Sequence, residues 1–302
     1  MFGSQRYSER PPRPQLRDLV SCVWTLQASS DGPAYEHRTV PNGCAEIAYI
    51  PQTGQVRLAG PRRESTLERL APGQTVVGVR LHPGVAPRIL GPTGAELVDL
   101  NVDVDVLWGR PAATLTERLL EAPAVDDAAG LLEEEILARR SAAHDPDLLI
   151  TEALRRMQPW QPMHLADTAS ELFISPRQLR RRFLSTFGFG PKTMQRILRF
   201  QGFLALANAS YAADLTIGGL AAAAGYSDQA HMSHECSRLT GLTPTGFLAE
   251  LRRSCGPNHD HAASFAQLRQ ALLVTARRER DVMPARARTP GLDRGSLPAS
   301  VF

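Results

Sequence analysis

The stretch SPRQLRRRF, residues 175–183, gathers side chains of the type that bind phosphate and guanine. Four of its nine residues are arginines: Arg177, Arg180, Arg181 and Arg182. The planar guanidinium of arginine can donate two parallel hydrogen bonds to O6 and N7 of guanine, and it also pairs with phosphate. A single charged run of this kind is more often a solvated helix face. What the arginines face therefore depends on the elements that position them.

A helix that begins at Ser175 would turn these arginines away from a core. The Ser175 side chain can accept a hydrogen bond from the backbone of Gln178 while the Gln178 side chain reaches back, which forms a capping box. From this start Leu179, Phe183 and Phe187 fall on one stripe at a spacing of four. We expect that stripe to be buried and the arginines to lie on the outer side.

The same frame occurs a second time, 52 residues further along the chain. LADTA (165–169) and FIS (173–175) lie over IGGLA (217–221) and GYS (225–227). Each copy reads as a short helix of small residues, a tight turn and a second helix, which is the plan of a helix-turn-helix unit. Two such units in one repeated frame reverse the preference for a solvated face and favour DNA binding.

The second reading helix has an outer surface of its own. Asp228 is expected to cap this helix, and Gly225 to supply the left-handed turn before it. Met232, Cys236 and Leu239 take the inward positions, so the residues expected to face DNA are Gln229, Ala230, Ser233 and His234. Gln, Ser and His offer adaptable hydrogen bonds, and alanine can meet a thymine methyl group. The two reading surfaces thus differ in chemistry.

Residues 191–208 predict a long helix between the two units. At about 1.5 Å per residue this helix is a rod of about 25 Å, which can hold two reading helices about one DNA turn, roughly 34 Å, apart. Four cations on and beside the rod are expected to contact phosphates: Arg182, Lys192, Arg196 and Arg199. Such contacts position a protein on DNA without specifying the sequence.

Residues 150–250 resemble the DNA-binding domain of AraC/XylS-type transcription regulators. The most specific pieces are SPRQLRRRF, the GPK and RILRFQ of the connecting helix, and GYSDQAH followed by RLTGLTPTGF. The resemblance implies a module that reads two adjacent major grooves of double-stranded DNA as a monomer, and a transcription activator that also touches RNA polymerase. Phe173 stands where the family commonly has a turn glycine, and Met232 and Cys236 stand where aromatic residues are common.

The N-terminal half predicts a β-rich domain. Short apolar stretches separated by Gly, Pro and Asn are typical of strands, as in VSCVWTL, CAEIAYI, VRLAG and TVVGVRLHP. Amphipathic helices follow at 113–122 and 128–143, which either pack on their own domain or make a subunit contact. HRTVPNGCAEIAYI, GVRLHPGVAPRILG and LVDLNVDVDVLWG resemble the β-rich domain attached to a subset of these regulators. The expected fold class is α+β, with a cupin-like β-rich domain before an all-α double helix-turn-helix domain.

The chain divides into five predicted segments. They are a flexible N-terminus (1–15), a β-rich sensor or dimerisation domain ending in helices (16–143), a linker (144–150), the double helix-turn-helix domain (151–253) and a mostly disordered tail (254–302). The tail contains one candidate helix at 264–281.

The charge is divided unevenly along the 302 residues. Residues 1–149 contain 15 Lys and Arg against 20 Asp and Glu, whereas residues 150–253 contain 12 against 7, although the net charge is only +3. Such asymmetry indicates a polyanion partner for the second half.

The four cysteines form no paired motif, so neither a disulfide framework nor a zinc site is expected. Neither a membrane-length apolar run nor a signal peptide occurs, so a cytoplasmic location is expected.

The β-rich half offers polar and aromatic candidates for binding. His37, Glu46 and His82 could hold a metal as cupin enzymes do, but ordinary hydrogen-bonded histidines are favoured because no paired ligand motif occurs. Aromatic residues that could line an effector pocket, or simply fill the core, are Trp24, Tyr49 and Trp108. Neither a catalytic motif nor a metal or cofactor site is expected.

The sequence therefore predicts a sequence-specific DNA-binding transcription regulator whose N-terminal domain senses a small-molecule effector or forms a homodimer. Two alternatives remain open. In one, the N-terminal half is a cupin-like metal-dependent enzyme fused to a DNA-binding module. In the other, it is only an oligomerisation scaffold and regulation needs no ligand.

Overall fold

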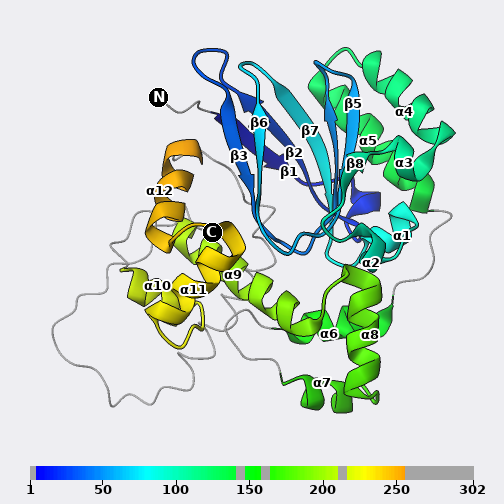
Figure 1. Ribbon diagram of the computed structural model, residues 1–302. Helices are drawn as coiled ribbons and strands as arrows, with labels where there is room; N and C mark the ends of the chain where they lie inside the picture. The colour runs from blue at the N-terminus through cyan, green and yellow to red at the C-terminus, as the bar shows by residue number, and fades with distance from the viewer. Residues whose placement is uncertain (1–4, 141–146, 158–163, 210–215, 256–302) are drawn as a thin grey trace.

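The computed structural model describes residues 5–140, 147–157, 164–209 and 216–255. Its elements form a β-rich part up to Arg140 and a helical part from Asp147 onward (Figure 1). This is the α+β arrangement that the sequence predicts. Within these ranges no helix is both long and apolar enough to cross a membrane.

A six-stranded antiparallel sheet forms the main layer of the β-rich part. From edge to edge it contains β1 (Gln5–Arg10), β2 (Val20–Ala28), β7 (Thr75–Leu81), β4 (Glu46–Ile50), β5 (Gln55–Ala59) and β8 (Asn101–Asp103). The four predicted apolar stretches are β2, β4, β5 and β7, and they occupy the four central positions. Central strands are covered on both faces, which explains why they are the most apolar.

A two-stranded sheet covers one face of the main sheet. β3 (Tyr35–Thr39) pairs antiparallel with β6 (Thr66–Leu70), with Tyr35 opposite Leu70 and Thr39 opposite Thr66. Tyr35 and Leu70 pack in one buried cluster with Trp24 of β2. Since side chains alternate along a strand, residues 35, 37 and 39 face the main sheet and Arg38 faces away from it.

Helices cover the opposite face of the main sheet. α4 (Arg110–Leu120) and α5 (Val125–Arg140) agree with the two predicted helices, and their apolar faces enter the same core as Val77, Val79 and Leu81 of β7. Both helices therefore pack on their own domain, which is one of the two arrangements that the sequence left open. Short elements complete this part: η1 (Pro14–Leu16), α1 (Ala86–Leu90), α2 (Gly94–Leu97) and α3 (Asp105–Trp108).

The prediction that residues 1–15 are flexible is wrong for the residues described. β1 pairs with β2 over Gln5–Arg10, and the ring of Tyr7 is buried and stacks on Trp24. The guanidinium of Arg10 donates to Glu133 of α5 at 2.9 Å. The Pro- and Arg-rich composition suggested disorder because it gives no sign of the distant strand and carboxylate that hold this segment.

The helical part contains two copies of a three-helix pattern. The first comprises α7 (Leu165–Glu171), α8 (Pro176–Phe187) and α9 (Pro191–Ala209), and the second comprises α10 (Ile217–Ala223), α11 (Gln229–Thr240) and α12 (Pro244–Cys255). The predicted repeat is confirmed and extends further than expected, because the third helices also match. Phenylalanines dominate the shared core, namely Phe183, Phe187, Phe200, Phe203 and Phe247.

The predicted linker of 144–150 ends three residues too late. α6 (Leu148–Arg156) already begins at Leu148, because the Asp147 carboxylate caps it by accepting from the backbone N–H groups of Leu149 and Ile150. Residues 141–146 lie outside the described residues, and so does the tail from 256 onward, including the candidate helix at 264–281.

Candidate nucleic-acid interface

The first reading helix, α8, begins as its sequence predicts. The Ser175 hydroxyl accepts from the backbone N–H of Gln178 at 3.2 Å, and the Gln178 side chain accepts from the backbone N–H of Ser175 at 2.8 Å. The helix ends at Gly188, whose φ of 77° closes it in the left-handed conformation. Contacts within a few residues therefore fix where α8 begins and ends. Its buried stripe fixes which side of the helix faces the core.

The two sides of α8 differ as expected. Leu179, Phe183 and Phe187 are fully buried, and the rings of Phe183 and Phe187 lie 5.5 Å apart. On the other side Arg177, Arg180 and Arg181 are exposed. Three guanidinium groups in one turn and a half are thus available to a partner, and their contact with bases stays a prediction.

The turns before the two reading helices have the same backbone shape but different residues. Gly225 of the second unit has a φ of 77°, and Phe173 at the matching position of the first unit has a φ of 55°. This left-handed region suits glycine and disfavours side chains with a Cβ. The Phe173 side chain is 97% exposed, so no burial of its ring offsets the strain.

The second reading helix, α11, is capped by Asp228. The Asp228 carboxylate accepts from the backbone N–H of His231 at 2.7 Å, and this hydrogen bond holds the pKa of the carboxyl below its usual range. Met232 and Cys236 are fully buried, at the inward positions that the sequence predicts. Of the residues expected to face DNA, three are exposed and one is half-buried: Gln229, Ala230 and His234, and Ser233 respectively.

The four predicted phosphate contacts have unequal surroundings. Lys192 is exposed. Arg182 pairs with Asp147 at 2.5 Å, which joins α8 to the start of α6. The ion pair between Arg196 and Glu235 joins α9 to α11, so both arginines are already engaged inside the protein.

Arg199 is the fourth predicted phosphate contact. Its guanidinium lies 5.5 Å from the ring centre of Tyr226, and Arg199 is half-buried. Burial raises the pKa of the Tyr226 hydroxyl, so this ring stays neutral beneath the cation. Sequence reasoning missed Asp147, Glu235 and Tyr226 as partners of the arginines. Glu235 was the residue that could have indicated such a pair, because it is an acidic residue on the inward side of α11 and therefore needs a cation as its partner.

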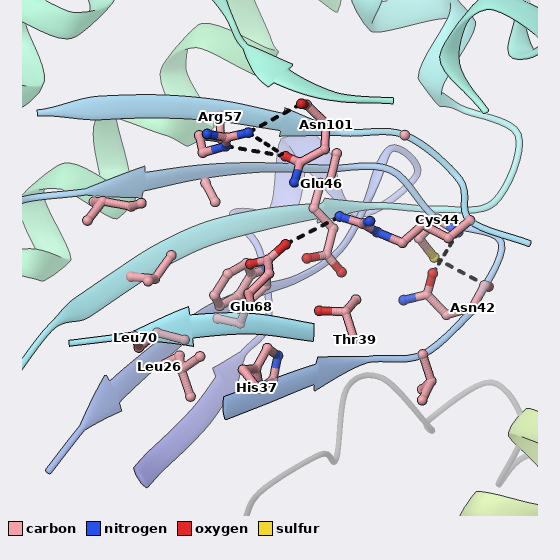
Figure 2. Close-up of a pocket in the computed structure, with 18 of the residues that line it drawn as sticks. Leu26, His37, Thr39, Asn42, Cys44, Glu46, Arg57, Glu68, Leu70 and Asn101 are labelled. Atoms are coloured by element: carbon pink, nitrogen blue, oxygen red, sulfur yellow. Dashed lines mark hydrogen bonds and ion pairs between the residues drawn. The ribbon is translucent and has the colours of Figure 1, made fainter. Parts of the chain in front are cut away.

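The β-rich part contains a cavity of about 140 Å³ between its two sheets. Figure 2 shows the side chains around it, which come from strands of both sheets, β2 to β8, and from neighbouring loops. Trp24, His37 and Glu46 all line this cavity. The other three sequence candidates do not. Tyr49 and Trp108 belong to the core on the helix-covered face of the sheet, and His82 contacts the carbonyl of Arg17 instead.

The cavity lining mixes apolar surface with paired charges. Arg62 donates to Glu68 at 3.4 Å, and Arg57 donates to Asn101 (Figure 2). The indole N–H of Trp24 is buried and has no hydrogen-bond partner among the described residues. An unsatisfied buried donor is costly, and this one belongs to a residue of the cavity wall.

The proposed metal triad is not assembled, because His82 lies away from His37 and Glu46. Within the parts of the chain that the structure describes, no group of three or more His, Cys, Asp or Glu residues could hold a metal ion. Cys22, Cys44 and Cys236 are free and buried. Burial raises the pKa of each thiol, to about 12 for Cys22.

Comparison with known proteins gives two family matches. Residues 168–250 match a helix-turn-helix domain family, and residues 8–103 match a domain family of unknown function (DUF6597). No curated protein sequence matches the chain. Among solved structures, ToxT from Vibrio cholerae aligns at 13% identity over 82% of this chain and 98% of that chain, with a TM-score of 0.39. A Vibrio cholerae ToxT structure with bound unsaturated fatty acid aligns at 11% identity over 84% and 96%, with a TM-score of 0.40.

A helix-turn-helix domain that carries two capped helices with exposed polar surfaces defines a DNA-binding transcription regulator. Within that class, residues 168–250 form an AraC-type helix-turn-helix domain, in agreement with the resemblance noted from the sequence.

Proposed function

We propose that the protein binds a single DNA duplex through α8 and α11, which enter successive major grooves. The observation that carries this proposal is the matched pair of capped helices, each with a buried stripe and an exposed polar outer side. Arg177, Arg180 and Arg181 would read guanine edges in one groove. Gln229, Ala230, Ser233 and His234 would read the other groove.

Phosphate contacts would add affinity that does not depend on sequence. Lys192 is exposed at the start of α9, next to α8, and it is the best placed of the predicted cations for this task. Arg182, Arg196 and Arg199 would need to leave their present partners or share them with phosphate. Lys192→Ala should therefore weaken binding to all sequences and reduce the salt dependence of the affinity.

The test uses a duplex selected from random DNA with the full-length wild-type protein. Arg181→Ala should lose about 5- to 150-fold affinity and relax base preference in one half of the site, because a bidentate base contact contributes about 1–3 kcal/mol. His234→Ala should relax the other half. Arg110→Ala, an exposed arginine on α4, is the control with the same charge change and should bind normally. Unchanged affinity and base preference in both reading-helix variants would remove these helices from the interface.

We also propose that the β-rich part binds a small-molecule effector in its cavity. The unpartnered indole N–H of Trp24 supports this, together with the apolar and charged groups around it. A thermal-shift screen against metabolites and divalent metals tests the proposal. Ala48→Phe, which fills the cavity from β4, is the matched control and should abolish any genuine shift.

Each outcome of that screen favours one reading of the N-terminal half. A small-molecule shift that Ala48→Phe removes supports the sensor. A metal-dependent shift lost in His37→Ala would instead favour the enzyme alternative. No shift with any compound would favour a scaffold that regulates without a ligand.

Two further partners, RNA polymerase and a second copy of the chain, are inferred from the family resemblance. Co-sedimentation of the purified protein with RNA polymerase on the selected duplex tests the first. Sedimentation equilibrium over a range of protein concentrations tests the second.

A further inference from the structure

The β-rich part contacts each helix-turn-helix unit separately. The first contact joins α2 to the end of α8. A Cβ placed on Gly94 would lie 2.3 Å from the carbonyl carbon of Thr186, and a Cβ placed on Gly188 would lie 2.4 Å from the carbonyl oxygen of Gly94. The two backbones therefore touch directly, and only glycine at both positions permits this approach.

The second contact joins the two-stranded sheet to the end of α11 and to α12. The Arg38 guanidinium donates to both carboxylate oxygens of Glu250, at 2.7 and 3.2 Å, and to the carbonyl oxygen of Thr240 at 2.8 Å. The backbone N–H of Ser65 donates to the carbonyl of Leu239 at 2.8 Å. These carbonyls belong to the last turn of α11, where no helical N–H is left to satisfy them.

The Arg38–Glu250 pair has the features of a strong ion pair. The fork of the guanidinium meets the carboxylate with two hydrogen bonds, which is the geometry with the greatest directionality. The Arg38 side chain is only 14% exposed, so solvent screens the pair less than it screens a surface pair.

The β-rich part also contacts α9, the helix that connects the two units. The Gln201 side chain of α9 donates to the carbonyl of Pro41 at 2.6 Å in a buried position. Met194, also on α9, packs against Gly43. Both residues of the β-rich part lie in the loop between β3 and β4, directly after Arg38 and its strand.

All of these contacts leave the reading surfaces free. On α8 the contact is at residues 186–188, whereas the reading arginines lie at 177–181. On α11 the contact is at residues 239–240, whereas the reading residues lie at 229–234. The β-rich part thus contacts the C-terminal ends of both helices, and these contacts do not involve the outer surfaces that would face DNA.

We propose that the β-rich part fixes the distance and rotation between the two reading helices, and that Arg38 and Glu250 are positioning residues for the second unit. This inference rests on the proposed reading of two grooves by α8 and α11. Binding two grooves at once gains most when the units are already held at the matching separation, because less freedom is lost on binding. The consequence is selectivity for the spacing between the two half-sites.

The same strand also borders the cavity. His37 and Thr39 line the cavity (Figure 2), while Arg38 between them pairs with Glu250 of α12. A molecule that displaces β3 would therefore displace the Arg38 pair too.

Spacing selectivity is measurable with the selected duplex and derivatives that carry one base pair more or fewer between the half-sites. Each added base pair rotates one half-site by about 34–36° relative to the other. We expect wild-type protein to prefer the selected spacing by about tenfold or more, and Arg38→Ala and Glu250→Gln to reduce that preference to about two- to threefold. Affinity for a duplex with a single half-site should not change in these variants.

Three controls separate positioning from general damage. Arg38→Lys, which keeps the charge, should retain part of the spacing preference. The double variant Arg38→Ala with Glu250→Ala should have the same spacing preference as Arg38→Ala alone, because the two changes remove the same interaction. Arg110→Ala should keep the wild-type preference. Glu250→Gln preserves the shape of its side chain, so it provides a folded variant if Arg38→Ala unfolds.

Wild-type spacing preference in folded Arg38→Ala or Glu250→Gln overturns the inference. The same applies if the preference falls only together with half-site affinity, since that pattern indicates damage to the reading unit itself. Failure of the proposed function looks different, because Arg181→Ala and His234→Ala would then leave DNA binding unchanged regardless of spacing.

Discussion

Replacing Phe173 with glycine should stabilise the protein, although most substitutions destabilise. The φ of 55° at Phe173 costs a residue with a Cβ about 1–2 kcal/mol relative to glycine. Against this, glycine gains about 0.5–1 kcal/mol of conformational freedom in the unfolded chain. The ring is 97% exposed, so its removal loses almost no buried surface. The net expectation is a gain of about 0.5–1 kcal/mol in the free energy of unfolding.

A gain of this size raises the Tm by about 1–2 °C in a protein of this size. Thermal unfolding followed by circular dichroism, with urea unfolding as a second measure, detects it. Phe173→Ala is the matched control, because it removes the ring but keeps the Cβ, and it should leave the Tm nearly unchanged. Gly225→Ala should do the opposite and lower the stability of the second unit. A Phe173→Gly protein no more stable than Phe173→Ala would refute the strain argument.

Two predictions concern titrating groups. The pKa of Asp228 is lowered in the folded state, so its contribution to stability is present above the unfolded pKa and is lost as the pH falls through the folded one. Asp228→Asn keeps a capping oxygen and should flatten the acid side of the stability curve in urea unfolding at pH 2–6. The thiols of Cys22, Cys44 and Cys236 are buried with raised pKa values and should resist a thiol reagent at pH 8 until denaturant is added, as read by mass mapping. Rapid labelling of native Cys22 would contradict this.

Local patterns predicted the helical part well because its signals lie within a few residues of each other. The capping box of Ser175 and Gln178 and the cap at Asp228 are contacts over three residues. The stripe of Leu179, Phe183 and Phe187 repeats with the helical period, so its burial follows once the helix forms.

The strands that were missed lack such local signals. β3 and β6 are short and mostly polar, and β1 lies in a segment whose composition suggests disorder. Each is held by a partner distant in the chain, as in the pairing of Tyr7 with Leu26. The separation of His82 from His37 and Glu46 has the same origin, since it depends on how the strands are ordered in the sheets.

The sequence by itself determined the duplicated helical frame, the caps and the outward arginines of α8, because these depend on helical periodicity and neighbouring residues. Only the tertiary structure decided which cations are engaged, since the partners of Arg182 and Arg196 lie 35 and 39 residues away. It also decided that Arg38, on a strand that lines the cavity, pairs with Glu250 at a separation of 212 residues. Contacts at such distances depend on the packing of whole elements, which no local pattern specifies.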